Sequence, residues 1–446
     1  MKHVDLAVIG AGPAGIAAAV AGARHGLSVT LLDESPSIGG QVLNVPETEL
    51  TVRGQSIRRG LELLDELQDL PVEILGQTAV WGIKGTHIAF AGVQGADQLE
   101  ARSVVIATGA REYVPPFPGW TLPGVMTLGG AQHLVKRDST LPGRSILIAG
   151  AGPLMWALAA ATLEKGGRVH AILDSSRPSA WLSALPHVAA IKERIGLALH
   201  YLGTIRAHHV PYHFLGDALR AYGANELERV VIGGNSYEVD ALCVGFGFRP
   251  NIELLQLAGC ALKFDQSLGG WIPVTDEGLR TDQPGLLAAG ECAGVGGAEK
   301  ALLEGELAAF SVLAMLGHEL NPSDLKREAW LRKHRGRELR FARVLNSVSE
   351  APAAYWHELT DDTILCRCEG VRAGQVRKTI RREHETLDAL KNELRVGQGA
   401  CQGRTCGPIL QHVLMQDLER AGHVPPPFHV RPPVKPLALG SFERQV

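Results

Sequence analysis

The first part of the chain alternates short apolar runs with glycine-rich turns. Val4–Ile9 is an apolar run of strand length, and the sequence GAGPAG follows it at 10–15. An alanine-rich segment continues to His25, and Val29–Asp33 is a second apolar run that ends in an acid. This order predicts a strand, a glycine turn, a helix and a parallel strand. We therefore expect the chain to begin with an α/β domain.

Further segments extend this domain. Apolar residues within Ile57–Leu70 recur at helical spacing, whereas glycines divide Val72–Phe90 into short β-like pieces. Ser103–Ala107, which is apolar from Val104 onward, predicts a buried strand. Much later, the glycine-bearing segment Leu286–Gly297 precedes a helix predicted over Ala298–Leu316.

The opening motif occurs a second time in the middle of the chain. Ile146–Ala149 predicts a strand, GAGPLM occupies 150–155, and a helix is expected to about Glu164. Val169–Leu173 predicts a further strand, which is followed by Asp174. A single recurrence so far along the chain indicates a duplicated domain rather than a solenoid. The predicted fold class is therefore α/β, with two dinucleotide-binding, Rossmann-like domains.

The composition changes after Pro322. Lys326–Arg343 contains eight basic residues and two acidic ones, and four of the seven cysteines follow between 366 and 406. Short helices are predicted at Val376–Arg382, Leu387–Leu394 and Ile409–Ala421. The predicted layout is a split first domain (1–118 and 275–322), an inserted second domain (119–274), a basic helical linker (323–360), a small cysteine-containing helical domain (361–424) and an extended, proline-rich tail (425–446).

Composition and charge exclude several classes of protein. The 446 residues carry a formal net charge of −3, which argues against nucleic-acid binding. Seven cysteines are too few for a disulfide scaffold. Asp5 interrupts the N-terminal apolar run, so no signal peptide is expected, and no segment predicts a transmembrane helix. We expect a cytoplasmic protein.

The glycines at 10–15 match the dinucleotide-binding fingerprint. Gly10 permits the tight turn, Gly12 lets backbone amides approach a pyrophosphate, and Gly15 lets the helix pack closely on the strand. Asp33 ends the second strand, close to where the fingerprint places an acid whose carboxylate binds ribose hydroxyls. The glycine motif suits FAD and NAD equally; a turn without a ligand is the alternative.

Two later segments favour FAD. The first reads VVIATG at 104–109, and the second reads TDQPGLLAAGE at 281–291. In flavoproteins with two dinucleotide domains, the second segment ends in Gly-Asp, and the aspartate binds a ribityl hydroxyl; here the pair is Gly-Glu. Ordinary strand-end turns remain the alternative. The predicted cofactor-binding residues are Gly10, Gly12, Pro13, Ala14, Gly15, Asp33, Glu34, Gly40, Gln41, Thr108, Gly109, Gly290 and Glu291.

The second glycine motif is degraded. Met155 stands where the third glycine belongs, so the helix cannot approach its strand as closely. Asp174 is placed to hold a ribose, so a working NAD(P)H site and a domain kept for structure alone both stay open. The chain contains no nucleophile elbow, no His-Glu-x-x-His motif and no cysteine pair near the first glycine turn, and we assign no catalytic residue.

Four cysteines form two close pairs. One residue separates Cys366 from Cys368, four separate Cys401 from Cys406, and the stretch 369–400 lies between the pairs. Four thiolates suit zinc or an iron–sulfur cluster, although structural zinc usually has two-residue gaps. The spacing, with Glu369 after the first pair, resembles the bacterioferritin-associated ferredoxin type of [2Fe-2S] domain. Gly403 and Gly407 would then free backbone amides to bond the sulfides.

The ordered motifs resemble one family along nearly the whole chain. GAGPAG, the degenerate GAGPLM, the Gly-Glu segment and the C-terminal cysteines are similar to those of the α (A) subunits of hetero-oligomeric, dye-linked amine and imino-acid dehydrogenases. These include opine oxidases, D-hydroxyproline and L-proline dehydrogenases, and hydrogen cyanide synthase. The resemblance implies a flavoprotein fold of the glutathione-reductase type with an added [2Fe-2S] domain.

The resemblance also implies a division of labour. A β subunit resembling D-amino-acid oxidases would hold its own FAD and oxidise the carbon next to nitrogen; some complexes have a small third subunit. This chain would pass electrons through a flavin and the [2Fe-2S] cluster to a quinone or other acceptor, which can place it at a membrane. Some relatives hold another adenine nucleotide in the first site and FMN between subunits. An NAD(P)H-dependent reductase and a non-catalytic scaffold are the alternatives.

The basic segment Lys326–Arg343 carries a separate hypothesis. Its charge suits docking to the β subunit or to an acidic electron acceptor. The alternative is a solvated helix that covers the first domain.

Overall fold

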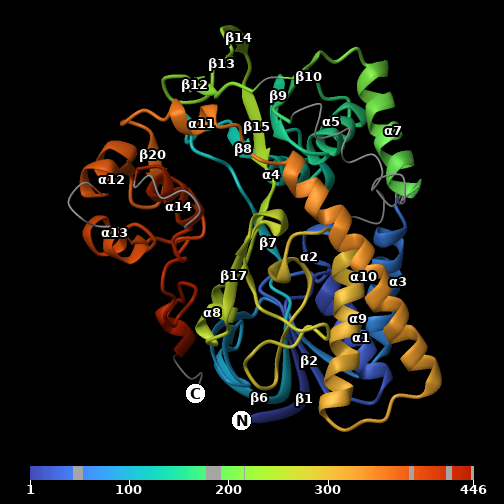
Figure 1. The fold of residues 1–446 in the computed structure, drawn as a ribbon. Coiled ribbons are helices and arrows are strands. Elements are labelled where there is room, and N and C mark those ends of the chain that lie inside the picture. The colour runs from blue at the N-terminus through green and yellow to red at the C-terminus, as the bar shows by residue number, and fades with distance from the viewer. Residues whose placement is uncertain (44–53, 177–191, 215, 381–385, 418–423, 443–446) are drawn as a thin grey trace. The chain divides into compact units, whose positions relative to one another are not determined.

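The computed structural model describes residues 1–43, 54–176, 192–214, 216–380, 386–417 and 424–442 (Figure 1). Contacts divide the chain into two compact units. Unit 1 comprises Met1–Arg111, Phe248–Val344 and Val430–Val446, and unit 2 comprises Glu112–Gly247 and Leu345–His429. Among the described residues, no helix is both long enough and apolar enough to cross a membrane.

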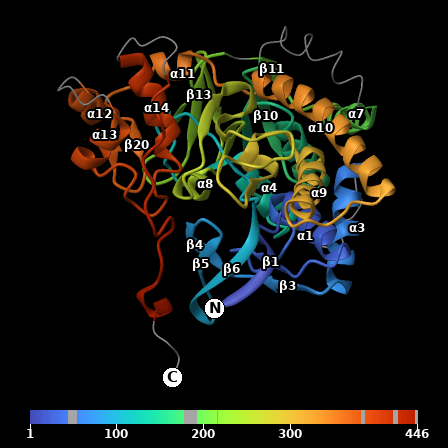
Figure 2. The same ribbon diagram turned by 60° about the horizontal axis from the view of Figure 1, so that its bottom comes forward.

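Unit 1 is built on a seven-stranded sheet with the order β3-β2-β1-β6-β5-β4, in which β19 also pairs with β6. Strands β3, β2, β1, β6 and β19 are parallel, while β4 and β5 pair antiparallel (Figure 2). The strands are β1 (Lys2–Ile9), β2 (Val29–Leu32), β3 (Val72–Leu75), β4 (Ala79–Lys84), β5 (His87–Gly92), β6 (Gly95–Ile106) and β19 (Leu286–Ala288). The four residues of β2 are all buried, as the continuous apolar run predicts.

Helices α1, α3 and α9 pack together in unit 1, and ion pairs from Arg327 and Arg335 join α10 to α9 (Figures 1 and 2). At the crossing of α1 and α9, a Cβ on Gly305 would lie only 2.0 Å from the Ala14 carbonyl oxygen, so the two backbones touch. The helices of this unit are α1 (Pro13–Arg24), α2 (Gly40–Leu43), α3 (Gln55–Asp69), α8 (Glu253–Leu257), α9 (Ala298–Met315) and α10 (Pro322–Val348), the last of which runs into unit 2. Short ladders join β7 (Ala110–Glu112) to β16 (Phe248–Pro250) and β17 (Leu262–Asp265) to β18 (Gly270–Pro273).

Unit 2 contains a second parallel sheet, with the order β11-β10-β9-β15-β8. Its strands are β8 (Val125–Thr127), β9 (Ile146–Ala151), β10 (Val169–Asp174), β11 (Tyr212–Phe214) and β15 (Ala241–Phe246). Helices α4 (Leu128–Lys136), α5 (Leu154–Glu164) and α7 (Lys192–Ala207) accompany it, and β12 (Arg220–Tyr222), β13 (Arg229–Ile232) and β14 (Asn235–Glu238) form a separate antiparallel sheet. The predicted duplication of the glycine-turn fold is confirmed.

The cysteine domain shares a hydrophobic core with this second sheet. The ring of Tyr355 is buried edge-on against Phe117 and Phe246, and the Trp120 indole donates a 2.7 Å hydrogen bond to the Ile364 carbonyl. The domain consists of α11 (Ala354–His357), β20 (Ile364–Cys366), β21 (Val371–Arg372), α12 (Ala373–Ile380), α13 (Leu387–Leu394) and α14 (Cys406–Asp417). The ends of two predicted helices, at 381–382 and 418–421, lie outside the described residues.

The two units divide the chain differently from the predicted domain layout. Residues 248–274, predicted for the second domain, belong to unit 1, and the predicted linker is largely the continuous helix α10. The tail beyond 430 also packs with unit 1, where the Val434 amide donates a 3.0 Å bond to the Trp81 carbonyl. Contacts distant in sequence decide these assignments, so changes in composition do not reveal them.

Candidate nucleotide and cysteine sites

The glycine turn between β1 and α1 has the geometry that the fingerprint requires. A Cβ on Gly15 would lie 1.7 Å from the Gly10 carbonyl oxygen, and one on Gly10 would lie 2.4 Å from the Ala107 oxygen. A Cβ on Gly12 would meet nothing within 4 Å, so this side of the turn is open. Pro13 then begins α1, whose free N-terminal amides favour an anion. The turn can therefore hold a pyrophosphate.

Asp33 follows β2 beside this turn. One oxygen of its carboxylate accepts a 2.5 Å hydrogen bond from the Ala11 amide, and the other accepts a 2.7 Å bond from the Ser35 amide. The backbone thus fixes the carboxylate against the glycine turn. Glu34 is exposed next to it.

The segment at Gly40 reaches the same turn. A Cβ on Gly40 would lie 2.8 Å from the Gly12 Cα, and the Gly39 amide donates a 2.8 Å bond to the Ala11 carbonyl. Gln41 is exposed beside them in α2. The structure therefore brings Gly40 onto the turn from a separate part of the sequence.

Thr108 and Gly109 follow β6 and bind a residue that the sequence analysis missed. The Asn251 amide side chain donates a 2.8 Å bond to the Thr108 carbonyl, and the Thr108 hydroxyl donates a 2.9 Å bond to the Asn251 carbonyl. The Asn251 backbone amide also donates to the Gly109 carbonyl at 3.0 Å. The only sequence signal for these hydrogen bonds is the Pro250-Asn251 pair, which follows a buried strand.

Gly290 meets the first helix, while the Glu291 side chain turns toward α9. A Cβ on Gly290 would lie 2.7 Å from the Ala14 Cβ, so these two predicted segments adjoin. One Glu291 carboxylate oxygen accepts 2.7 Å bonds from the amides of Gly296 and Gly297, just before α9. The extra methylene of glutamate gives the side chain the reach to make these bonds. Its contact with a ribityl chain stays a prediction.

A buried ion pair forms hydrogen bonds with the backbone of Gly290. Lys300 and Glu304, one turn apart on α9, have fully buried side chains and approach within 2.7 Å. The ammonium also donates to the Gly290 carbonyl at 2.9 Å, and the Gly290 amide donates to Glu304 at 2.9 Å. Arg335 of α10 donates to the other Glu304 oxygen at 2.8 Å. Because buried charges need partners, this network fixes the backbone at Gly290.

The four predicted cysteine ligands lie together in unit 2, and their thiols are linked by hydrogen bonds. Cys406, at the start of α14, bonds both Cys366 and Cys401, and Cys401 also bonds Cys368. The bond with Cys406 lowers the pKa of the Cys366 thiol and that of the Cys401 thiol, whereas the same bonds raise the pKa of Cys406. Four sulfur donors, the ligand type of an iron–sulfur cluster, thus lie close together, although among the described residues no group of three or more side chains is arranged as a formed metal-ion site.

Backbone amides around the thiols also fit such a cluster. The amides of Glu369 and Gly397 donate to the Cys366 sulfur, and that of Thr405 donates to Cys401. The Gly407 amide instead donates to the Gly403 carbonyl at 2.7 Å, because it belongs to the first turn of α14. The amides that bond the sulfurs of Cys366 and Cys401 are therefore those of Glu369, Gly397 and Thr405, and not that of Gly407.

Two family models match the parts of the chain that contain these residues. Residues 4–306 match the family described as pyridine nucleotide-disulphide oxidoreductase, and residues 364–416 match the BFD-like [2Fe-2S] binding domain. This chain belongs to the pyridine nucleotide-disulphide oxidoreductase family. The predictions of a two-domain flavoprotein fold, an oxidoreductase and a C-terminal [2Fe-2S] domain are thereby confirmed.

Individual relatives in this family cover nearly the whole chain. The opine oxidase A chain of Rhizobium meliloti is 33% identical over 456 residues, which cover 99% of this chain and 98% of that protein. Hydrogen cyanide synthase subunit HcnB of Pseudomonas protegens is 28% identical over 461 residues, covering 98% and 96%. The solved L-proline dehydrogenase from P. horikoshii shares the fold, with a TM-score of 0.73, 24% identity and coverage of 99% and 80%.

The second Rossmann unit of this family member differs from the first at its glycine turn. A Cβ on Gly152 would lie 2.6 Å from the Ser349 hydroxyl oxygen, so the chain itself covers the side that is open at Gly12. Met155, in place of the third glycine, is fully buried within α5. Its Cβ prevents the close contact that Gly15 makes in the first unit.

The acid of the second unit is also engaged. Asp174 is fully buried and accepts a 2.5 Å hydrogen bond from the Tyr212 hydroxyl, which in turn accepts a 2.9 Å bond from the Trp156 indole. Burial and the Asp174 charge raise the pKa of Tyr212. These contacts and Ser349 favour retention of the second domain for structure rather than for NAD(P)H binding.

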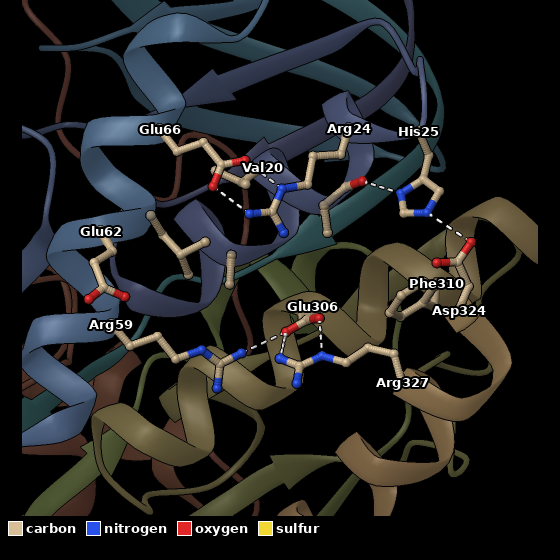
Figure 3. A pocket seen from close by; sticks show the side chains of 13 residues that line it. Val20, Arg24, His25, Arg59, Glu62, Glu66, Glu306, Phe310, Asp324 and Arg327 are labelled. Atoms are coloured by element: carbon tan, nitrogen blue, oxygen red, sulfur yellow. Dashed lines mark hydrogen bonds and ion pairs between the residues drawn. The ribbon is translucent and has the colours of Figure 1, made fainter.

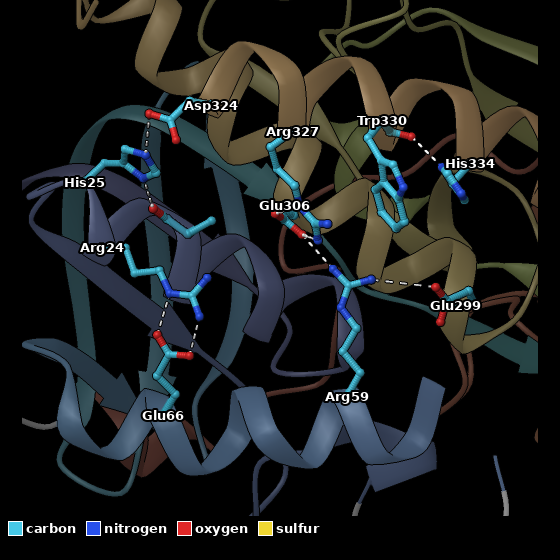
Figure 4. Close-up of polar contacts among 11 residues, drawn as sticks. Arg24, His25, Arg59, Glu66, Glu299, Glu306, Asp324, Arg327, Trp330 and His334 are labelled. Atoms are coloured by element: carbon cyan, nitrogen blue, oxygen red, sulfur yellow. Dashed lines mark hydrogen bonds and ion pairs between the residues drawn. The ribbon is translucent and has the colours of Figure 1, made fainter. Parts of the chain in front are cut away.

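The basic segment of this family member is largely a helix held by ion pairs (Figure 4). The carboxylate of Glu306 on α9 binds Arg327 of α10 at 2.6 Å and Arg59 of α3 at 2.7 Å. The basic residues paired with acids are Arg327, Arg332, Arg335 and Arg343. Exposed cations that pair with no acid of the described residues are Lys326, Lys333, Arg337 and Arg340. Arg327, Arg335 and Arg343 therefore attach α10 to other elements, whereas the shortest pair of Arg332 is with Glu328 of the same helix.

A pocket of about 440 Å³ lies among α1, α3, α9 and α10 (Figure 3). Arg24 of α1 pairs with Glu66 of α3, and His25 lies 3.2 Å from Asp324 of α10. Together with the Glu306 pairs, these contacts join the four helices around the pocket. The pocket wall thus consists of contacts that hold α1, the helix after the glycine turn, to its neighbouring helices.

Proposed function

We propose that this chain is the electron-transferring subunit of a heteromeric dehydrogenase. The substrate would be an amino acid, an imino acid such as proline or hydroxyproline, or an opine, oxidised in a partner FAD subunit resembling D-amino-acid oxidases. The observation that carries this proposal is the contrast between the two glycine turns. The first is open at Gly12, whereas Ser349 covers the second at Gly152, so NAD(P)H is disfavoured as the electron donor.

The residues of the two sites would hold two redox groups. A nucleotide with an ADP portion, FAD in the first instance, would place its pyrophosphate at Gly12 and its ribose at Asp33. The four cysteines would hold a [2Fe-2S] cluster. A flavin would supply two-electron chemistry at the first site, and the cluster held by the cysteines would supply one-electron transfer. The thiolates and their amide donors would hold and tune the cluster.

The relatives support a multi-subunit assembly. The two named above are subunits of larger enzymes, opine oxidase and hydrogen cyanide synthase. We therefore propose that the partner is a β subunit, that a small third subunit is a further component, and that the acceptor is a quinone, reached at the membrane surface from the cytoplasm. Another adenine nucleotide at the first turn, with FMN at the subunit interface, is the second arrangement that we propose to test.

The test is co-purification from the native host, followed by assays for flavin, iron and labile sulfide. Stopped-flow mixing of the complex with proline, hydroxyproline, octopine and glycine should reduce the chromophores with one substrate. Mixing with NADH or NADPH should give no rapid bleaching. Rapid bleaching of the isolated chain by NADH would favour a self-contained reductase, and zinc without flavin would favour a scaffold.

Docking through α10 has its own test. Lys333→Glu, Arg337→Glu and Arg340→Glu reverse three exposed charges that pair with no described acid. The triple variant should keep the melting temperature of the parent because no ion pair is lost. If these charges dock the β subunit, co-purification should fail. Undiminished complex and turnover would remove the docking hypothesis.

A further inference from the structure

The C-terminal tail lies outside both matched regions, which end at 306 and 416, yet it packs against the nucleotide-binding unit. Val434 is buried in a core cluster with Val4 and Val80 of the first domain. Its amide bonds the Trp81 carbonyl, and the ring of Phe442 contacts Trp81 edge-on at 5.9 Å. These contacts hold a defined stretch of tail on unit 1.

Lys435 follows the buried Val434 and reaches the residues at the end of β2. Its ammonium forms an ion pair with Glu34, and its side chain is only one-third exposed (33%). Burial lowers the pKa of Lys435, and the nearby Asp33 charge acts in the opposite direction. A cation from the far end of the chain thus lies beside both acids predicted for the ribose end of the first site.

The two acids create an electrostatic problem for an anionic ligand. ADP carries negative charge on its phosphates, and two adjacent carboxylates repel it, most strongly where solvent is partly excluded. One ammonium beside Glu34 offsets this repulsion, while the Asp33 carboxylate stays in place to accept hydrogen bonds from ribose hydroxyls. The tail therefore supplies a charge that the β2 end itself lacks.

We propose that Lys435 is a residue of the nucleotide site, so that docking of the tail and binding of an adenine nucleotide favour each other. This inference rests on the nucleotide site of the proposed function and is independent of electron transfer. If tail docking strengthens nucleotide binding by some factor, nucleotide binding must strengthen tail docking by the same factor.

The experiment uses the full chain, stripped of nucleotide and titrated calorimetrically with ADP, the portion common to FAD and ATP. Lys435→Met keeps the aliphatic stem and removes the charge, and should weaken ADP binding at least about fivefold. Lys435→Arg should restore most of the affinity. Arg431→Met removes an exposed cation from the same tail and should change the affinity less than about twofold.

Hydrogen exchange of the tail supplies a second measurement. ADP should slow exchange of the 430–442 amides in the parent and slow it less in Lys435→Met. Equal ADP affinity and equal tail protection in both chains would overturn the inference. Failure of the parent to bind ADP would overturn the inference together with the nucleotide site. ADP coupling without substrate-driven reduction would instead contradict only the proposed electron transfer.

Discussion

Gly399 offers the sharpest test of the cysteine site, because a single methyl group there meets a predicted cluster ligand. A Cβ on Gly399 would lie 2.3 Å from the Cys368 Cβ and 3.0 Å from a Glu369 carboxylate oxygen. Carbon atoms in contact normally lie about 3.5–4.0 Å apart, so Gly399→Ala requires a shift of more than about 1 Å. Ligand distances in a metal site tolerate only about 0.2 Å.

The expected cost follows from this overlap. Overpacking of this size costs about 1–3 kcal/mol, which corresponds to about 5- to 150-fold in the equilibrium for holding the cluster. Gly399→Ala should therefore lower iron and labile sulfide per chain and weaken the visible absorption of the cluster. The backbone φ of Gly399 is one that alanine adopts, so the contact alone is tested.

Gly407→Ala is the matched control in the same domain. A Cβ there would lie 3.5 Å from the Phe428 ring, an ordinary contact, and Gly407 lies within α14 beside Cys406. This variant should retain iron, sulfide and the spectrum of the parent. If Gly399→Ala holds as much cluster as Gly407→Ala, with the same reduced-state EPR signal, the assignment of Cys368 as a ligand in this geometry is refuted.

Four further variants test other parts of the molecule. Gly12→Ala should change the free energy of unfolding in urea by less than about 0.5 kcal/mol. The same variant should weaken ADP binding in calorimetry, because its methyl group fills the open side of the turn. Gly15→Ala should instead lower the free energy of unfolding by about 3 kcal/mol or more. Lys300→Met should cost about 1–3 kcal/mol in the same urea assay, because the Gly290 carbonyl loses its donor and the buried Glu304 carboxylate keeps only Arg335 as a cation; a cost near zero would contradict the network. Asp5 accepts hydrogen bonds from Ser28 that lower its pKa, so its stabilisation is present above the unfolded pKa of about 4 and is lost as pH falls through the folded value. The difference in melting temperature between the parent and Asp5→Asn should therefore shrink on acidification, and a constant difference would refute this.

Local sequence pattern was sufficient to predict the strands and helices next to the two glycine turns. The run at Val4–Ile9, which is apolar except for Asp5, and its counterpart at Ile146–Ala149 lie within β1 and β9, because strands of a buried parallel sheet are mostly apolar. The helix predicted at Leu387–Leu394 matches α13. The proximity of the four cysteines could also be predicted, because their spacing along the chain is typical of loops that bind an iron–sulfur cluster.

Contacts between distant segments could not be predicted in this way. Nothing near Gly152 indicates that Ser349, from a much later part of the chain, covers it. Lys435 likewise reaches Glu34 from the opposite end of the chain. Such contacts depend on the tertiary path of α10 and of the tail, whereas periodicity reports only which face of an element is buried.

The shared core of unit 2 gives the degenerate Rossmann domain a reason to persist. Tyr355, Phe117 and Phe246 join the cysteine domain to the second sheet, so neither part completes its hydrophobic core alone. Removing the second Rossmann domain would leave the cysteine domain with an incomplete hydrophobic core. Binding of the proposed cluster should therefore stabilise the whole unit, and loss of iron should lower the melting temperature of the second Rossmann domain as well. A domain whose own ligand site is covered thus remains indispensable as the support of another.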